Sequence, residues 1–312
     1  MDHIYAVGVG GANIDLCGRS YAPIEPCDSN PGEIEISAGG VTRNICDNLA
    51  RLGADVKLVS AVGDDLFAQI ICEQSAQAGI DVSHIYHTPG RSSSMYLAIL
   101  DNSGDMHVAL SDMHVLQNLP LDYLERKREL IANAAVVVTD PCMKAERFER
   151  VLSYCRPGQI VCVDPVSTAY ARALIPYIGQ IHTVKPNRLE LEILAGQPVD
   201  TDARLESACE TLLKRGVQRV FVSLGAEGCF YMDHTGLVLR RKLRPVKQMV
   251  NASGAGDSFA AAMLYATLNE WSVEKTLDFA MAAGIAALSH ERTINPNMSV
   301  SLLEDILEAH RI

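Results

Sequence analysis

Residues 251–257, with the sequence NASGAGD, combine small side chains with a carboxylate and lead into a helical pattern at residues 258–268. Glycine lets the backbone approach a ligand closely, and the amides and dipole of a helix start favour an anion. Beside such a turn, Asp257 could take a proton from an attacking hydroxyl while the amides stabilise a transferred phosphoryl group. An ordinary small-residue turn with an acidic first helical turn fits the segment equally well.

A second glycine-rich element, AGGVTRN at residues 38–44, also leads into a helical pattern, which extends over residues 44–52. It lies near the other end of the chain. Two glycine-rich helix starts favour a binding site more strongly than one does, because each could bring backbone amides up to a ligand.

With these two elements the chain resembles the ribokinase-like, or PfkB, family of carbohydrate kinases. The family signatures are a GG element followed by Asn and a GAGD element near the C-terminus. Other matches follow in the family's order: NID at 13–15, KPN at 185–187 with Glu190, and SLG at 223–225 with Gly228. The resemblance covers nearly the whole chain and implies one kinase domain over residues 1–312.

Within the family, three segments look most like the members that phosphorylate pseudouridine. They are DSNPG at 28–32, GGVTRN at 39–44 and a hairpin at 95–113 with DNSG at its tip. This closer resemblance implies ATP-dependent transfer to the 5'-hydroxyl of pseudouridine. A kinase for another nucleoside or sugar is the alternative within the family. A non-catalytic nucleoside sensor is the alternative outside catalysis, although the intact GAGD element favours an enzyme.

The family resemblance also implies roles for individual residues. Asp257 would be the general base, and the anion pocket would consist of Gly254, Ala255 and Gly256. The substrate would be bound by Asn13, Asp15, Gly39, Gly40, Arg43, Asn44, Ser94, Tyr96 and Asp112, with Ser93 as a further candidate. ATP would be bound by Lys185, Asn187, Ser223, Gly225, Gly228, Gly254 and Gly256. Mg²⁺ would be oriented through water by Asn187 and Glu190. The adenine pocket is expected around residues 246–250 and 283–287.

Several of these residues have simpler explanations. Asn187 and Glu190 together could be a helix cap with an acidic first turn. Asp15 could be a solvated carboxylate at a strand end. Arg43 could contact the base or a phosphate, or could pair with an acidic neighbour. Many family members have Asp where this chain has Asn251, so dependence on K⁺ is left open.

A dinucleotide-binding oxidoreductase is a competing interpretation, because residues 8–12 (GVGGA) begin like a GxGxxG fingerprint. Asn13 occupies the third glycine position, and the residues that follow have a strand or loop pattern instead of the required helix. The sequence therefore disfavours this class.

Composition limits the partners and the compartment. The 312 residues are 48% hydrophobic and 21% charged, and the net charge is −11, which disfavours nucleic acid and anionic membranes as partners. The nine cysteines form no CxxC pair, and most are expected to be reduced core residues. The N-terminus has no basic region and only a short apolar run, so we expect a cytoplasmic protein.

The elements that must position these residues alternate between strand and helix. Strands are predicted at 5–9, 57–61, 135–139, 160–164, 182–184 and 219–224, and helices at 44–52, 65–78, 121–133, 145–155, 187–195 and 202–215. This order predicts a mainly parallel sheet with helices on both faces, and the resemblance implies the three-layer α/β/α ribokinase-like fold.

Later in the chain, a hairpin at 229–232 and 238–240 and a long helix from Ser272 to Ser289 are expected. Residues 15–37 and 93–112 have strand patterns without helices and predict a small antiparallel sheet. By resemblance this sheet is the family's lid over the substrate, and it would form a homodimer with its twin.

Overall fold

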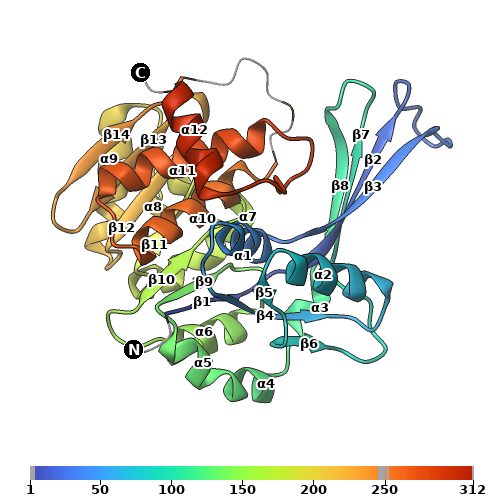
Figure 1. Ribbon diagram of the computed structural model, residues 1–312, viewed down its shortest axis with the longest axis horizontal. Helices are drawn as coiled ribbons and strands as arrows, with labels where there is room; N and C mark the ends of the chain where they lie inside the picture. The colour runs from blue at the N-terminus through green and yellow to red at the C-terminus, as the bar shows by residue number, and fades with distance from the viewer. Residues whose placement is uncertain (1–3, 245–249, 251–252, 311–312) are drawn as a thin grey trace.

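A large, mainly parallel sheet forms the centre of the molecule (Figure 1). The computed structural model describes residues 4–244, 250 and 253–310. From one edge to the other the strands are β14 (Val238–Arg241), β13 (Cys229–Asp233), β12 (Arg219–Ser223), β11 (Thr183–Val184), β10 (Ile160–Val163), β9 (Val136–Thr139), β1 (Ala6–Val9), β4 (Val56–Val62) and β5 (Ile80–Asp81), and β6 (Ile85–His87) also pairs with β4. Pairs β12–β13 and β13–β14 are antiparallel, as the predicted hairpin requires.

Helices cover both faces of this sheet because successive strand residues point to opposite sides. Val136 and Val138 join one buried cluster, whereas Val137 joins the other. The first cluster includes residues of α1 (Val41–Arg51), α2 (Leu66–Gln77), α10 (Ala255–Leu268), α11 (Val273–Leu288) and α12 (Val300–His310). The second includes residues of α3 (His114–Gln117), α4 (Leu121–Arg126), α5 (Arg128–Asn133), α6 (Ala145–Tyr154), α7 (Thr168–Leu174), α8 (Arg188–Ala195), α9 (Asp202–Lys214) and the 3₁₀ turn η1 (Ile175–Gln180). The predicted three-layer fold is confirmed.

Most predicted elements lie within a few residues of the observed ones. The Ser272 hydroxyl caps α11 by accepting from the Lys275 amide, as predicted. The helix predicted over 121–133 is instead two short helices, α4 and α5, which meet at Lys127. Helices α3, α7 and α12 and the short strands β5 and β6 were not predicted.

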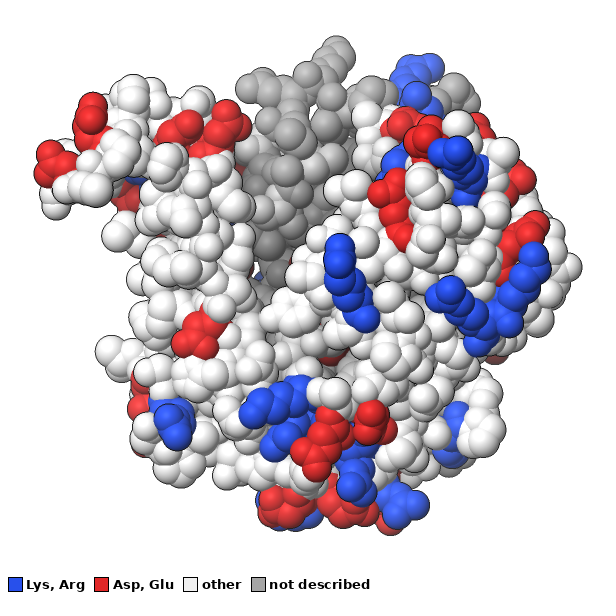
Figure 2. Space-filling model, turned by 180° about the vertical axis from the view of Figure 1, so that it is seen from behind, with Lys and Arg blue, Asp and Glu red and all other residues white. Residues whose placement is uncertain are grey.

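A second, four-stranded sheet stands away from the main body, and acidic side chains lie at its far end (Figures 1 and 2). Its order is β3 (Gly32–Gly39), β2 (Asn13–Ser20), β7 (Met95–Leu100) and β8 (Met106–Asp112). The prediction of an antiparallel sheet is wrong at its centre, because β2 and β7 pair in parallel. Both strands run outward from the large sheet, and each turns back through its own hairpin to form β3 or β8.

All nine cysteines are free, and five of them are buried, which agrees with the prediction that most are core residues. Among the helices in the described part of the chain, none combines the length and the apolar character that a bilayer crossing needs.

The carboxylate of Asp140 holds three segments of the chain together where the two sheets meet. This buried carboxylate follows β9 and accepts from the Gly11 amide at 2.8 Å, the Thr42 hydroxyl at 2.5 Å and the Cys142 amide at 3.0 Å. The Thr42 amide also donates to it, at 3.3 Å. The start of β2 and the start of α1 are therefore fixed to the end of β9.

Replacing Asp140 with Ala should lower the free energy of unfolding by about 3–5 kcal/mol, because several buried donors lose a charged acceptor together. Urea denaturation followed by circular dichroism measures the change. Asp122→Ala is the matched control, since Asp122 pairs with Arg126 in solvent and should change stability by less than about 0.5 kcal/mol. Equal stability of the two variants would contradict this assignment.

Candidate active site

Polar residues that follow neighbouring strands meet at one edge of the large sheet. Asp164 follows β10, Lys185 follows β11, and these strands pair in parallel. The first turn of α10 approaches the same edge, because a Cβ atom added at Gly256 would lie 3.2 Å from Lys185 Nζ. The carboxyl ends of parallel strands are where ligands bind in such sheets.

The start of α10 has the geometry of an anion site. Gly254 precedes the helix with a φ of 76°, and a side chain there would collide with the Thr293 carbonyl, so the position requires glycine. The first amides of the helix lack partners within the helix and point outward with the positive end of its dipole. Residues 246–249 and Asn251 lie outside the described residues, and the prediction about K⁺ rests on Asn251.

Asp257 is the acidic residue of this first helical turn. It is half-buried, and its neighbours Ala255 and Gly256 line a cavity beside this helix. Its Oδ2 accepts a hydrogen bond of 2.9 Å from Asn44 Nδ2. Burial, followed by the charge of Asp164, raises the pKa of Asp257 to about 7, and the Asn44 hydrogen bond and Lys185 oppose this increase. A carboxylate with a pKa near neutrality is suited to accept a proton.

Lys185 supplies positive charge beside Asp257. Its Nζ lies 3.1 Å from Asp164 Oδ2, and both side chains are almost completely buried. Burial opposes the charge on Lys185, but the carboxylates of Asp164 and Glu190 raise its pKa overall. Asp164 was a candidate from the sequence because it directly follows a predicted strand, but no specific role was predicted for it.

On the side of the small sheet, Asn13 and Asp15 lie together as predicted. Asn13 Nδ2 donates to Asp15 Oδ1 at 2.7 Å. Burial raises the pKa of Asp15, whereas the Asn13 hydrogen bond and Arg43 lower it. A side chain at Gly39 would collide with the Asp15 carboxylate, and Gly40 has a φ of 100° with no space for a Cβ atom beside Gly11.

Strand register decides which residues of the small sheet share a face with Asp15. Asp15 pairs with Tyr96, and Tyr96 pairs with Ser111, so all three project to the same side. Asp112 pairs with Met95 and projects to the opposite side, where it accepts from the His114 amide at 3.1 Å. The prediction that Asp112 contacts the substrate is therefore corrected, because alternation places Ser111 on that face.

Ser93 and Ser94 lie at the base of β7 and are buried. The Ser93 hydroxyl donates to Asp65, the N-cap residue of α2, at 2.7 Å. This hydrogen bond connects the start of β7 to α2. The Ser94 carbonyl accepts from the Ile14 amide at 2.9 Å, and its hydroxyl has no hydrogen-bond partner in the described part of the chain.

Arg43 is 1% exposed and pairs with Asp47 at 3.0 Å. Of the alternatives for this residue, the ion pair with an acidic neighbour is the one that the structure contains. The guanidinium is enclosed by Asp47, Asn44 and the Ala38 carbonyl, which leaves it no exposed face for the predicted contact with the substrate.

Asn187 and Glu190 form a capping box at the start of α8. The Glu190 amide donates to Asn187 Oδ1 at 2.9 Å, and the Asn187 amide donates to Glu190 Oε2 at 2.8 Å. Helix capping thus accounts for their spacing. No group of three or more acidic, His or Cys side chains with the geometry of a metal site occurs in the described ranges. The Asn187 and Glu190 side chains fit a magnesium ion that is bound mainly by phosphate and water.

A cavity of about 530 Å³ opens between α10, α11 and the loop after β12. It brings together five of the residues predicted to bind ATP, namely Asn187, Ser223, Gly225, Gly228 and Gly256. Its apolar walls, which the sequence did not identify as a group, are Leu243, Phe259, Met281, Ile285 and Leu288. Gly284 and Ile285 lie in the stretch predicted for adenine.

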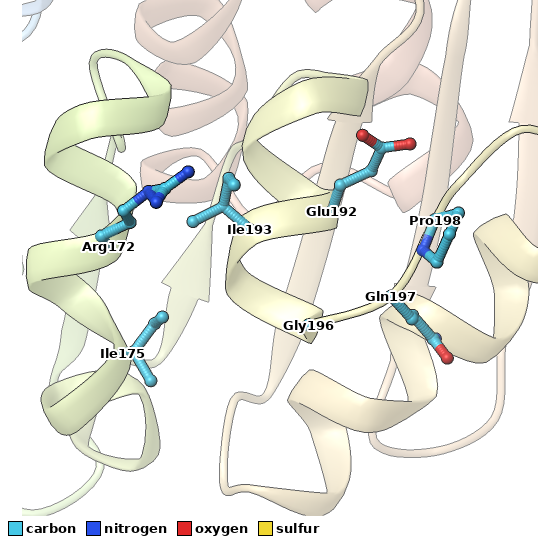
Figure 3. A pocket seen from close by; sticks show the side chains of 7 residues that line it. All are labelled: Arg172, Ile175, Glu192, Ile193, Gly196, Gln197 and Pro198. Atoms are coloured by element: carbon cyan, nitrogen blue, oxygen red, sulfur yellow. The ribbon is translucent and has the colours of Figure 1, made fainter.

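Another hollow, of about 620 Å³, lies between α7 and α8 (Figure 3). Arg172, Ile175 and Ile193 line it, and it is far more open than the cavity beside α10. None of the predicted site residues lies in it, and we assign no binding role to it.

The chain is similar to known carbohydrate and nucleoside kinases. The model of the pfkB family of carbohydrate kinases matches residues 4–299. The chain is 35% identical over 305 residues to pseudouridine kinase of Escherichia coli (strain K12), which covers 97% of this chain and 96% of that protein. It is 28% identical to guanosine-inosine kinase of Exiguobacterium acetylicum over 93% of this chain and 96% of that protein.

The fold is also that of solved ribokinases. Ribokinase of Arabidopsis thaliana, in complex with ribose and ATP, superposes with a TM-score of 0.84 at 22% identity, covering 98% of this chain and 97% of that one.

The raised pKa of Asp257 makes a prediction about stability. Between its ordinary value of 3.8 and about 7, the folded chain keeps a proton that the unfolded chain has lost. Stability therefore falls as the pH rises through this window. Above pH 7 the folded protein bears the full free-energy cost of keeping Asp257 ionised. Asp257→Asn removes that cost and should stabilise the protein more at pH 8 than at pH 5, by about 1–3 kcal/mol. Urea denaturation at both pH values measures the difference, and a pH-independent difference would contradict the raised pKa.

Proposed function

This chain belongs to the pfkB family of carbohydrate kinases, and from that premise we propose that it transfers the γ-phosphoryl group of ATP to the 5'-hydroxyl of pseudouridine. The observation that carries the proposal is the convergence of Asp257, the anion-binding start of α10 and the neighbouring cavity at one edge of the sheet. Similarity to a pseudouridine kinase over almost the whole chain supports the choice of acceptor.

In this proposal Asp257 is the general base. It takes the proton of the 5'-hydroxyl as that oxygen attacks the γ-phosphorus, and the bond from the γ-phosphorus to the leaving ADP oxygen breaks. Charge that develops on the phosphoryl oxygens is stabilised by the amides of Ala255 and Gly256 and by Lys185. Mg²⁺ would offset the triphosphate charge, with Asn187 and Glu190 as the residues that orient its water ligands.

The acceptor would bind on the other side of Asp257. Asn13 and Asp15 offer an amide and a carboxylate, which together donate to and accept from two neighbouring hydroxyl groups of a ribose. Gly39 and Gly40 let the backbone come close to the sugar. Tyr96 and Ser111, which share a face with Asp15, would lie over the base when the small sheet closes as a lid.

A coupled assay of ADP release tests the proposal with pseudouridine, uridine, adenosine, ribose and fructose 6-phosphate as acceptors. We expect kcat/KM for pseudouridine to exceed that for each other acceptor by at least about tenfold, a difference of about 1.4 kcal/mol in transition-state binding. Preference for another acceptor would replace pseudouridine but keep the kinase assignment. Ligand binding without ADP release from any acceptor would favour the sensor.

We also propose that the small sheet forms a homodimer. Ile34, Ile36, Val108 and Leu110 share its face opposite Asp15 and are each about half exposed or more. Such a contiguous aliphatic face on an outward-projecting sheet is typical of a protein interface. A second copy of the chain would cover it with the same residues, as a two-fold axis requires.

Light scattering tests the dimer with the double variant I34K/L110K. Two lysines on this face should convert a dimer into a monomer, because burying their charges against the partner is unfavourable. Ile175→Lys is the matched control, since Ile175 is an exposed isoleucine on η1, on the main body. A monomeric parent protein at all concentrations, or a double variant that remains dimeric, would refute the interface.

A further inference from the structure

A continuous series of polar contacts extends behind Asp257 into α1. Arg43 Nη1 binds Asp47 Oδ2 at 3.0 Å, and Arg43 Nη2 donates to Asn44 Oδ1 at 2.9 Å. Asn44 Nδ2 then donates to Asp257 Oδ2 at 2.9 Å. Arg43 is thus separated from the carboxylate of Asp257 by a single amide group.

The chemistry of these groups determines how the Asn44 amide is oriented. A guanidinium only donates hydrogen bonds, so the carbonyl oxygen of Asn44 must face Arg43. The amide NH₂ group then necessarily faces Asp257, which accepts. The guanidinium itself is held in place by Asp47 and by the Ala38 carbonyl, at 3.1 Å.

Stability alone does not explain a buried arginine at this position. Asp47 already has a second cationic partner, Arg51, whose Nε lies 2.5 Å from Asp47 Oδ1. Arg43 Nε has no hydrogen-bond partner among the described residues, so its burial carries an additional cost. The Arg43 guanidinium is costly to bury and lies one amide away from Asp257. A role in the site therefore explains its position better than stability does.

We propose that Arg43 is a positioning residue, which orients the Asn44 amide toward Asp257 and places a fixed positive charge behind it. The effect of this residue on turnover rests on the proposed kinase function, whereas its effect on Asp257 does not. It acts through Asn44 and does not touch the substrate.

The charges that face Asp257 from other elements determine the expected direction. Asp164 and Asp15 raise the pKa of Asp257, and Lys185 lowers it. Arg43 faces it from α1, and the charge of Asp257 in turn favours the charged form of Arg43. Without Arg43, Asn44 is free to rotate and one positive charge is lost, so the pKa of Asp257 should rise further above about 7.

The test compares R43M, the double variant R43M/D47L and the control R51M. The double variant avoids leaving Asp47 buried with only one partner, in case R43M does not fold. R51M removes the other ion pair of Asp47 and leaves the contact between Arg43 and Asn44 unchanged. The carboxyl group of Asp257 is titrated by NMR in unliganded protein with ¹³C-labelled aspartate, and the signal is assigned by its absence from D257N.

We expect Asp257 to titrate on the order of half to one pH unit higher in R43M and in the double variant, and at the parental pH in R51M. With the acceptor that the parent phosphorylates, kcat at pH 7 should fall by about twofold to fivefold and recover at pH 9, with the KM for ATP unchanged. A merely structural defect would not recover at high pH.

An Asp257 titration that is unchanged in the folded double variant, or shifted equally in R51M, would overturn the proposal. A parent protein that releases no ADP with any acceptor would refute the proposed function instead, and the titration would still decide the role of Arg43.

Discussion

The hydrogen bond between Asn44 and Asp257 is the contact on which the rest of the site depends. It joins residues 213 positions apart and places the first turns of α1 and α10 next to each other. Both helices belong to the same buried cluster on one face of the sheet, so their packing determines the distance between the two glycine-rich starts. Small side chains permit this close approach, because α10 packs with buried alanines at 260–262. The fold thus brings the two glycine-rich helix starts together at one carboxylate.

Charge at this edge of the sheet is arranged for chemistry more than for stability. The carboxylates of Asp164 and Asp257 lie near the ammonium of Lys185, and Asp164 and Lys185 are almost completely buried whereas Asp257 is half-buried. The raised pKa of Asp257 means that folding makes its ionised form less favourable, which is a cost that a purely structural site would avoid. Active sites commonly keep such unfavourable groups because the reaction needs them. The capping box at Asn187 and Glu190 shows that residues proposed to serve the site also stabilise a helix start.

Sequence reasoning predicted the parts of this structure that local patterns determine. Apolar runs identified the strands of the large sheet, and Ser272 identified a helix start. The glycines at 39, 40 and 254 were found from their motifs, and the structure shows why glycine is needed there, because the backbone has a positive φ or leaves no space for a side chain. Contacts between distant segments were not predictable in the same way. The parallel pairing of β2 with β7 and the face on which Asp112 lies depend on register, which a single strand pattern does not determine. The position of Arg43 one amide away from Asp257 required the packing of α1 against α10.

The central claim is that Asp257 accepts the proton of the attacking hydroxyl at the start of α10. The most direct measurement is the single-turnover rate of phosphoryl transfer by Asp257→Asn, at saturating ATP and with the acceptor that the parent phosphorylates. The account predicts a rate lower by on the order of 10³-fold, because asparagine cannot take the proton, and an ATP dissociation constant within about threefold of the parent's. A variant that transfers the phosphoryl group within about tenfold of the parental rate would contradict it.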